Sequence, residues 1–156
     1  MRQRGLLIFR DIAIVIFIVF PCAHDGDIME NPCYSGGCLC GHIRFQARGL
    51  PGNPHSCSCD FCRRHSGAPT LCWVEFPRQA VEWNGPGGMP ALYRSSPYSS
   101  RAFCPRCGST LGAIDDEPTV ALATGSFDRA DLPELCPTSH AFADVCPEWW
   151  RIDGMR

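Results

Sequence analysis

Three cysteines, Cys57, Cys59 and Cys62, fall within six residues of the sequence, in the stretch SCSCDFCRRHSG. Cysteine thiolates bind zinc, and this C-x-C-x-x-C spacing places three of them on one short segment. Three thiolates leave one of the four zinc positions free for water or a substrate, which is the arrangement of a catalytic site. The spacing equally allows a closed site with a fourth ligand from elsewhere in the chain. Candidates for that ligand are His55, His65, His140 and another cysteine.

Four further cysteines form two close pairs. Cys38 and Cys40 lie in GGCLCG, and Cys104 and Cys107 lie in FCPRCGS, where a glycine follows the second cysteine. Glycine at such a knuckle lets backbone amides turn toward sulfur atoms that carry charge. The two pairs together supply the four thiolates of a closed, structural zinc site. More than sixty residues separate the pairs, so this zinc would link the front of the domain to its later half and stabilise the fold.

A disulfide framework is the alternative use of the twelve cysteines. It is disfavoured, because C-x-C pairs bridge poorly and the spacings match those of metal-binding knuckles. Free, metal-binding cysteines are typical of reducing compartments, so the cysteine usage favours a cytoplasmic protein.

The composition excludes several other classes of function. A chain of 156 residues with 45% hydrophobic residues can build one ordinary domain. Its net charge of -2 provides no basic surface for nucleic acid, and we predict no nucleic-acid partner. All fourteen basic residues are arginines, which excludes a Schiff-base lysine and the lysine of a phosphate-binding loop.

The elements that must position the cysteines are predicted to be short strands. Fifteen glycines and fourteen prolines interrupt the chain too often for long helices. Several segments alternate apolar and polar residues, as half-buried strands do. The candidate strands are residues 42–47, 71–76, 80–83, 91–94, 109–114, 119–124 and 139–144. We therefore predict an all-β fold with few or no helices, in which the cysteine motifs lie at strand ends or in loops.

The first 28 residues differ from the rest of the chain. Their apolar run, residues 12–20, is too short to span a bilayer and directly follows two charged residues. One interpretation is the apolar region of an export signal. We favour a start codon assigned too early, because Met29 opens the stretch MENPCYSGGCLCG as a native beginning. We expect residues 1–28 to lie outside the fold, residues 29–156 to form a single domain, and no stable membrane insertion.

In order and spacing, these motifs resemble the glutathione-dependent formaldehyde-activating enzyme family, also called the centromere protein V type. The matching segments, in chain order, are YSGGCLCGHIRF, CSCDFCRRHSGAP, Trp73, FCPRCGSTL, TGSFD and SHAFADVCPEWWRIDG. The resemblance runs from about Tyr34 to Gly154. Three knuckles in this order, with their intervening glycines, make it highly specific.

The resemblance implies a β-tent zinc-binding fold with two zinc ions per chain. The implied ligands of the structural zinc are Cys38, Cys40, Cys104 and Cys107, and those of the catalytic zinc are Cys57, Cys59 and Cys62. It also implies a carbon–sulfur lyase of the S-(hydroxymethyl)glutathione synthase type. The substrates would be glutathione, or a similar thiol, and formaldehyde or a related small aldehyde.

The residues beside the three-cysteine motif have two interpretations each. Arg63 or Arg64 could hold a glutathione carboxylate by a bidentate pair, or both could be solvated surface residues. His65 could move a proton, although a structural hydrogen bond is the more usual role of a lone histidine. His140 is expected to pack against the site or support it.

A non-catalytic binding module is the alternative function. Relatives of the centromere protein V type suggest a zinc-stabilised scaffold that binds a macromolecule. Such a module predicts a basic tail or patch, and the near-neutral sequence has no basic run.

Overall fold

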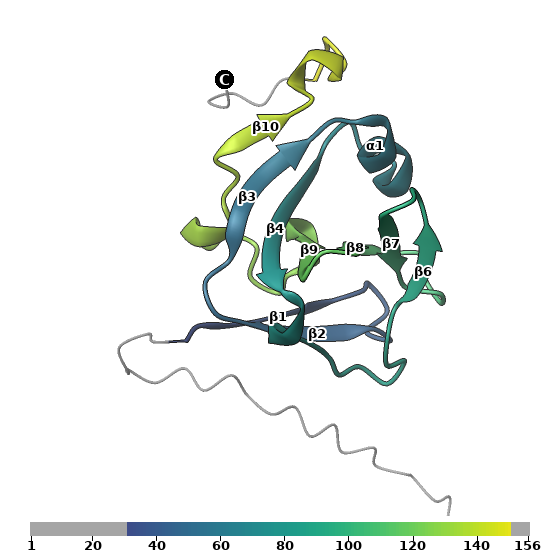
Figure 1. The fold of residues 1–156 in the computed structure, drawn as a ribbon, viewed down its shortest axis with the longest axis vertical. Coiled ribbons are helices and arrows are strands. Elements are labelled where there is room, and N and C mark those ends of the chain that lie inside the picture. Colours follow the sequence, from purple (N-terminus) through teal and green to yellow (C-terminus); the bar gives the residue numbers. More distant parts are fainter. Residues whose placement is uncertain (1–30, 151–156) are drawn as a thin grey trace, which may run out of the picture.

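The computed structural model describes residues 31–150, and these form two β-sheets and one short α-helix (Figure 1). The larger sheet has strand order β10-β3-β4-β9-β8-β7-β6, and the smaller has order β1-β2-β5. The strands are β1 (Cys33–Gly37), β2 (Arg44–Arg48), β3 (Gly52–Cys57), β4 (Leu71–Pro77), β5 (Val81–Trp83), β6 (Ala91–Arg94), β7 (Ser99–Phe103), β8 (Thr110–Asp115), β9 (Thr119–Ala123) and β10 (Ser139–Ala141). The helices are α1 (Asp60–Ser66) and the 3-10 helices η1 (Arg78–Ala80), η2 (Thr124–Ser126), η3 (Pro133–Leu135) and η4 (Ala143–Val145). The all-β prediction is confirmed.

The helix α1 and the small sheet lie at opposite ends of the described part of the molecule (Figure 1). Strands β1 and β2 lie across one end, and α1 lies at the other, beside the ends of β3 and β4 (Figure 1). Strand β10 joins the edge of the large sheet by pairing with β3 in parallel. The remaining paired strands are antiparallel.

The alternating segments of the sequence are strands as predicted, with small shifts of their ends. Residues 71–76, for example, lie in β4, where Trp73, Val74 and Phe76 are buried. Periodicity does not reveal β1, β3 and β7, whose sequences are CYSGG, GNPHSC and SSRAF. Glycine, serine and proline dominate these sequences, and they carry little strand preference of their own. Pairing with neighbouring strands therefore decides their conformation.

The strand predicted for residues 139–144 is shorter than expected. It ends at Ala141, and the next residue, Phe142, has a φ of 55°, which takes the chain out of the extended conformation of a strand. The 3-10 helix η4 follows directly.

The sequence predicts that every cysteine motif lies at a strand end or in a loop. This prediction is wrong for Cys62, which lies inside α1. The sulfur of Cys59 caps this helix by accepting a hydrogen bond from the backbone amide of Cys62. Gly67 ends the helix with a φ of 73°, a conformation that favours glycine. Cysteine is not a usual N-cap residue, so the sequence lacks an ordinary helix start at this point.

An aromatic cluster joins the two sheets. Tyr34 and Phe45 come from the small sheet, Phe76 comes from β4, and Phe127 follows η2. The rings of Phe45 and Phe127 meet edge to face, with centroids 5.1 Å apart. Burial of each large apolar ring stabilises the fold by roughly 2–3 kcal/mol, so this cluster fixes one sheet against the other.

The predicted N-terminal extension, residues 1–28, lies outside the described residues. Within residues 31–150, no helix is both long enough and apolar enough to cross a membrane.

Candidate metal centres

Cys38, Cys40, Cys104 and Cys107 come together from two distant parts of the chain. Their four sulfur atoms all lie within 4.8 Å of one another. The Sγ atoms of Cys38 and Cys40 are 3.6 Å apart, and those of Cys40 and Cys104 are 3.9 Å apart. Thiolates at about 2.3 Å from a tetrahedral zinc ion lie roughly 3.8 Å from each other. The spacing of the four sulfurs therefore fits a closed tetrahedral metal site.

Local turns supply hydrogen bonds to this four-cysteine cluster. The backbone amide of Ile43 donates to Sγ of Cys38 at 3.2 Å. Gly108 adopts a φ of 76° directly after Cys107, and the Ser109 hydroxyl lies 3.2 Å from the Cys107 sulfur. Hydrogen bonds from Ser109 lower the pKa of Cys107 to about 5, which favours the thiolate that a metal ion binds.

Cys57, Cys59 and Cys62 form the second cluster, and their sulfur atoms also lie within 4.8 Å of one another. Cys57 ends β3, Cys59 caps α1, and Cys62 lies in the first turn of that helix. Cys57 and Cys62 are only 6% and 4% exposed. A strand end and a helix start thus bring three sulfurs to one point.

Burial and hydrogen bonds shift the pKa values of these three cysteines in different directions. Burial raises the pKa of Cys57 and of Cys62. Burial also acts to raise the pKa of Cys59, but hydrogen bonds, first from the Cys62 backbone amide, outweigh it and lower the pKa. Three thiolates this close repel one another and need a positive charge among them. A soft, thiolate-rich donor set of this kind fits zinc.

No histidine, cysteine or carboxylate within residues 31–150 joins the three-cysteine cluster as a fourth ligand. Nδ1 of His55 donates to the backbone carbonyl of Asn53 at 2.8 Å. Nε2 of His140 lies 2.9 Å from Oγ of Ser58, the residue between two of the cysteines. Two of the three histidines suggested for closing the site, His55 and His140, are therefore held by other partners.

His65 is the third histidine beside the cluster. Burial and then the nearby charge of Arg101 lower its pKa, against a hydrogen bond with the Gly112 backbone that raises it. Its Nε2 is buried and has no hydrogen-bond partner among the described residues.

The two arginines that follow Cys62 have different surroundings in the structure. Arg63 forms an ion pair with Asp60, one turn earlier on α1. Arg64 is exposed and lines a cavity together with Arg101 of β7. Of the two predicted carboxylate contacts, Arg64 is thus the one that lines a cavity.

Two cavities lie against α1, the helix that carries Cys62, and His65 lines both of them. The first, of about 500 Å³, lies between α1 and the strands β6 and β7. The second, of about 580 Å³, is lined by Leu71 and Ala123, which pack against the three-cysteine cluster. Cys38 and Cys107 of the four-cysteine cluster also line it.

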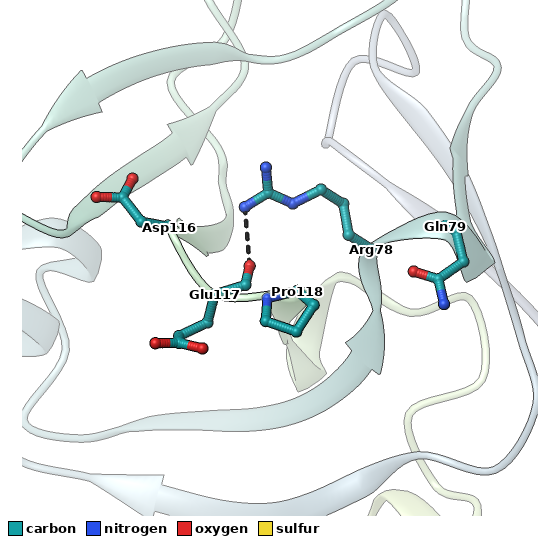
Figure 2. Close-up of a pocket in the computed structure, with 5 residues that line it drawn as sticks. All are labelled: Arg78, Gln79, Asp116, Glu117 and Pro118. Atoms are coloured by element: carbon teal, nitrogen blue, oxygen red, sulfur yellow. Dashed lines mark hydrogen bonds between the residues drawn. The ribbon is translucent and has the colours of Figure 1, made fainter.

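A further cavity, of about 460 Å³, lies where Arg78 contacts the turn between β8 and β9. Figure 2 shows the Arg78 side chain reaching the backbone of Glu117 beside Asp116 and Pro118. Nη2 of Arg78 donates to the Glu117 carbonyl at 3.1 Å and also bonds the Asp115 carbonyl. Arg78 therefore ties η1 to the turn between β8 and β9, and neither cysteine nor histidine lines this cavity.

Comparison with protein families gives a match to the glutathione-dependent formaldehyde-activating enzyme over residues 33–145. That range holds all the described strands and both cysteine clusters. The chain belongs to this family. In this member of the formaldehyde-activating family, the fold brings distant cysteine motifs together, and both clusters could hold metal ions.

Two individual proteins are similar to this member of the family. An uncharacterized lyase of Schizosaccharomyces pombe is 32% identical over 80 residues, which cover 51% of this chain and 56% of that protein. The match thus spans little more than half the length of that relative. A crystal structure of a Rhodobacter sphaeroides protein matches with a TM-score of 0.50 and 20% identity, over 60% of this chain and 87% of that one. This likeness supports the fold alone.

Two residues at the site carry no sequence signal that predicts them. Ser58 stands between two cysteines as an ordinary small residue, yet it is fully buried and bonded to His140. Arg101 lies in a strand that periodicity does not reveal. Its contacts with Phe61 and Trp73 arise only when distant elements pack together.

Proposed function

We propose that this protein is a zinc-dependent carbon–sulfur lyase-type enzyme. It would condense formaldehyde, or a related small aldehyde, with glutathione or a similar thiol to give S-(hydroxymethyl)glutathione. The observation that carries the proposal is the three-cysteine cluster, which has no fourth ligand among the described residues and whose helix α1 also lines two cavities. The family match and the lyase name of the Schizosaccharomyces pombe relative support the reaction class.

Each cluster would bind one zinc ion, and one of these ions would be structural and the other catalytic. The proposed structural ligands are Cys38, Cys40, Cys104 and Cys107, and the proposed catalytic ligands are Cys57, Cys59 and Cys62. A four-thiolate site leaves no position for a substrate, whereas a three-thiolate site leaves one. Free thiolates persist in reducing compartments, so a cytoplasmic location is part of this proposal.

The reaction needs no oxidant or reductant. The thiol sulfur forms a bond to the carbonyl carbon, the carbonyl electron pair moves to oxygen, and that oxygen takes up the proton that the thiol loses. Zinc at the three-cysteine cluster, with its one open position, would either bind the substrate thiol and lower its pKa or polarise the aldehyde oxygen. Trp73, only 3% exposed, belongs to the same buried core cluster as Cys57 and Cys62 and would help to keep water from the site.

Exchange NMR spectroscopy on an equilibrium mixture of glutathione and formaldehyde tests the proposal. Zinc-loaded protein is expected to exchange free glutathione and its adduct faster than the spontaneous reaction does. Cys59→Ser should return the rate to the spontaneous value, because it removes a proposed ligand. Cys136→Ser, at an exposed cysteine outside both clusters, is the matched control and should keep the full rate. A wild-type rate no higher than the spontaneous one would show that the formaldehyde reaction is wrong.

A further inference from the structure

The cavity between α1 and β7 contains two arginines without a carboxylate partner. Arg64 and Arg101 both line it, and none of its lining residues is acidic. Within residues 31–150, neither arginine lies in ion-pair distance of an aspartate or glutamate, in contrast to Arg44, Arg63 and Arg94. The cavity therefore carries positive charge that the protein itself does not neutralise.

Arg101 is held in a fixed position by aromatic rings. Its guanidinium carbon lies 6.0 Å from the centroid of the Phe61 ring and 5.9 Å from that of Trp73. These contacts stabilise a cation while leaving its N–H groups free to donate. Nε of Arg101 is buried and has no hydrogen-bond partner among the described residues. A buried donor without a partner is costly, and a ligand that accepts from the guanidinium would satisfy part of this side chain's hydrogen-bonding capacity.

The same elements connect this cavity with the three-cysteine cluster. Phe61 and Arg64 lie on α1, the helix that also carries Cys62. Trp73, beneath Arg101, belongs to the same buried core cluster as Cys57 and Cys62. A small molecule with an anionic group in the cavity can therefore present another of its groups at the cluster.

We propose that Arg64 and Arg101 bind a carboxylate of the thiol substrate and make the enzyme selective for carboxylate-bearing thiols over neutral ones. This inference rests on the proposed function of the three-cysteine cluster. A guanidinium binds a carboxylate by two parallel hydrogen bonds, and the aromatic walls strengthen that attraction by excluding water. The pair joins one residue next to the cysteine motif with one from a distant strand.

Calorimetric titration of zinc-loaded protein with S-methylglutathione tests this carboxylate site without turnover, because the methylated sulfur cannot react. Arg64→Gln and Arg101→Gln should each weaken binding by at least about tenfold, as loss of a charge-assisted hydrogen bond does. Arg48→Gln is the matched control, since Arg48 is exposed on β2, where its side chain donates to Gln46 and lines neither cavity beside α1. It should bind as the wild type does.

Two modified ligands identify which carboxylate is bound. The glycyl ethyl ester of S-methylglutathione lacks the glycine carboxylate, and S-methyl-cysteinylglycine lacks the γ-glutamyl one. The ligand without the bound carboxylate should bind wild type about as weakly as the Arg101→Gln variant binds the intact compound. Equal, undiminished binding of both modified ligands would overturn the inference.

Control measurements distinguish loss of the carboxylate site from loss of folding in the Arg101 variant. Arg101→Gln removes the aromatic contacts of a half-buried side chain, so its zinc content and melting temperature are measured alongside. Arg101→Lys keeps the charge and should recover part of the affinity. If Arg101→Gln does not fold, the S-methylglutathione affinity of Arg64→Gln tests the inference, because Arg64 is exposed and its substitution should not disturb folding.

The outcomes separate this inference from the proposed reaction. Loss of S-methylglutathione binding in both variants, with no catalysed exchange in wild type, would uphold the carboxylate site and reject the lyase reaction. Catalysed exchange in wild type, with unchanged S-methylglutathione affinity in both variants, would reject the carboxylate site alone. Wild-type protein that fails to bind millimolar S-methylglutathione would also reject it.

Discussion

Oγ of Ser58 lies 2.9 Å from Nε2 of His140, which bonds the three-cysteine loop to a residue 82 positions further along the chain. The backbone amide of Ser58 also donates to the carbonyl of Ala141 at 3.1 Å. Ser58 is fully buried, and β10 pairs with β3 beside these bonds. His140 therefore supports the cysteine loop without being one of its metal-ligand candidates.

Substitution of His140 by alanine should weaken zinc at the three-cysteine cluster alone. It leaves the buried Ser58 hydroxyl without this partner, and loss of supporting contacts typically costs about ten- to a hundredfold in metal affinity. Competition with a zinc chelator measures the affinity of each equivalent of metal. His55→Ala, which removes a bond to the neighbouring Asn53 carbonyl, is the control and should leave both affinities unchanged. Wild-type affinity in His140→Ala would contradict a supporting role.

Loss of one cysteine should have different effects in the two clusters. Cys104 is fully buried and lies in a core cluster with Ile43 and Leu111. Cys104→Ser is expected to lower the melting temperature by more than about 10 °C, because structural metal binding is coupled to folding. Cys59→Ser should lower it by only a few degrees, since the core remains intact. Circular dichroism on heating measures both, and similar shifts in the two variants would argue against separate roles.

Gly36 is a position where the fold has no space for a side chain. A Cβ there would lie 2.3 Å from Cζ of Phe45 and 2.4 Å from the carbonyl oxygen of Ser126. Gly36→Ala should therefore reduce the free energy of unfolding by about 3 kcal/mol, as overpacking does. Gly125→Ala is the control, because nothing lies within 4 Å of a Cβ at that position. Denaturant unfolding compares the two, and equal stability would mean that the small sheet can shift to admit a methyl group.

At high pH, the free energy of unfolding should depend on whether the Tyr34 hydroxyl is protonated. Burial, then the hydrogen bond that its hydroxyl donates to Glu134 at 3.1 Å, raise the pKa of Tyr34 from 10.0 to about 12. The unfolded chain loses this proton first, so the contribution of Tyr34 to stability falls as pH rises from about 10 to about 12. The stability difference between wild type and Tyr34→Phe should shift against wild type by up to about 3 kcal/mol across that window.

The source of this pH dependence can be checked with a second variant. Glu134→Gln keeps an acceptor but removes its charge, so it should reduce the effect without abolishing it, since burial is the larger cause. Urea unfolding at a series of pH values provides the measurement. A wild-type and Tyr34→Phe difference that stays constant from pH 10 to 12 would contradict the assigned pKa.

The sequence predicts the cysteine groups and part of the sheet because both leave local patterns. Ligand pairs such as Cys38 and Cys40 are close in the chain, and the structure brings them to one point with Cys104 and Cys107. The strand β4 is also predicted from local sequence, since successive residues such as Trp73 and Val74 point to opposite faces of a sheet.

Features that depend on distant contacts could not be predicted in this way. Adjacency to Cys62 suggested Arg63 as a substrate contact, but Asp60 pairs with it across one helical turn. Arg101 reaches the site only because β7 packs near α1, and no local pattern records that contact. The helix itself begins at a cysteine cap, which ordinary capping preferences do not indicate.

Titration of metal-free protein with zinc tests the division into a structural and a catalytic centre most directly. Four thiolates bind zinc more tightly than three, so the first equivalent should occupy the four-cysteine cluster. Circular dichroism and the glutathione–formaldehyde exchange rate are measured on the same samples. We predict that folding is complete after one equivalent and that catalysis rises only between one and two equivalents. Full catalysis at one equivalent, or none when two are bound, would contradict the account.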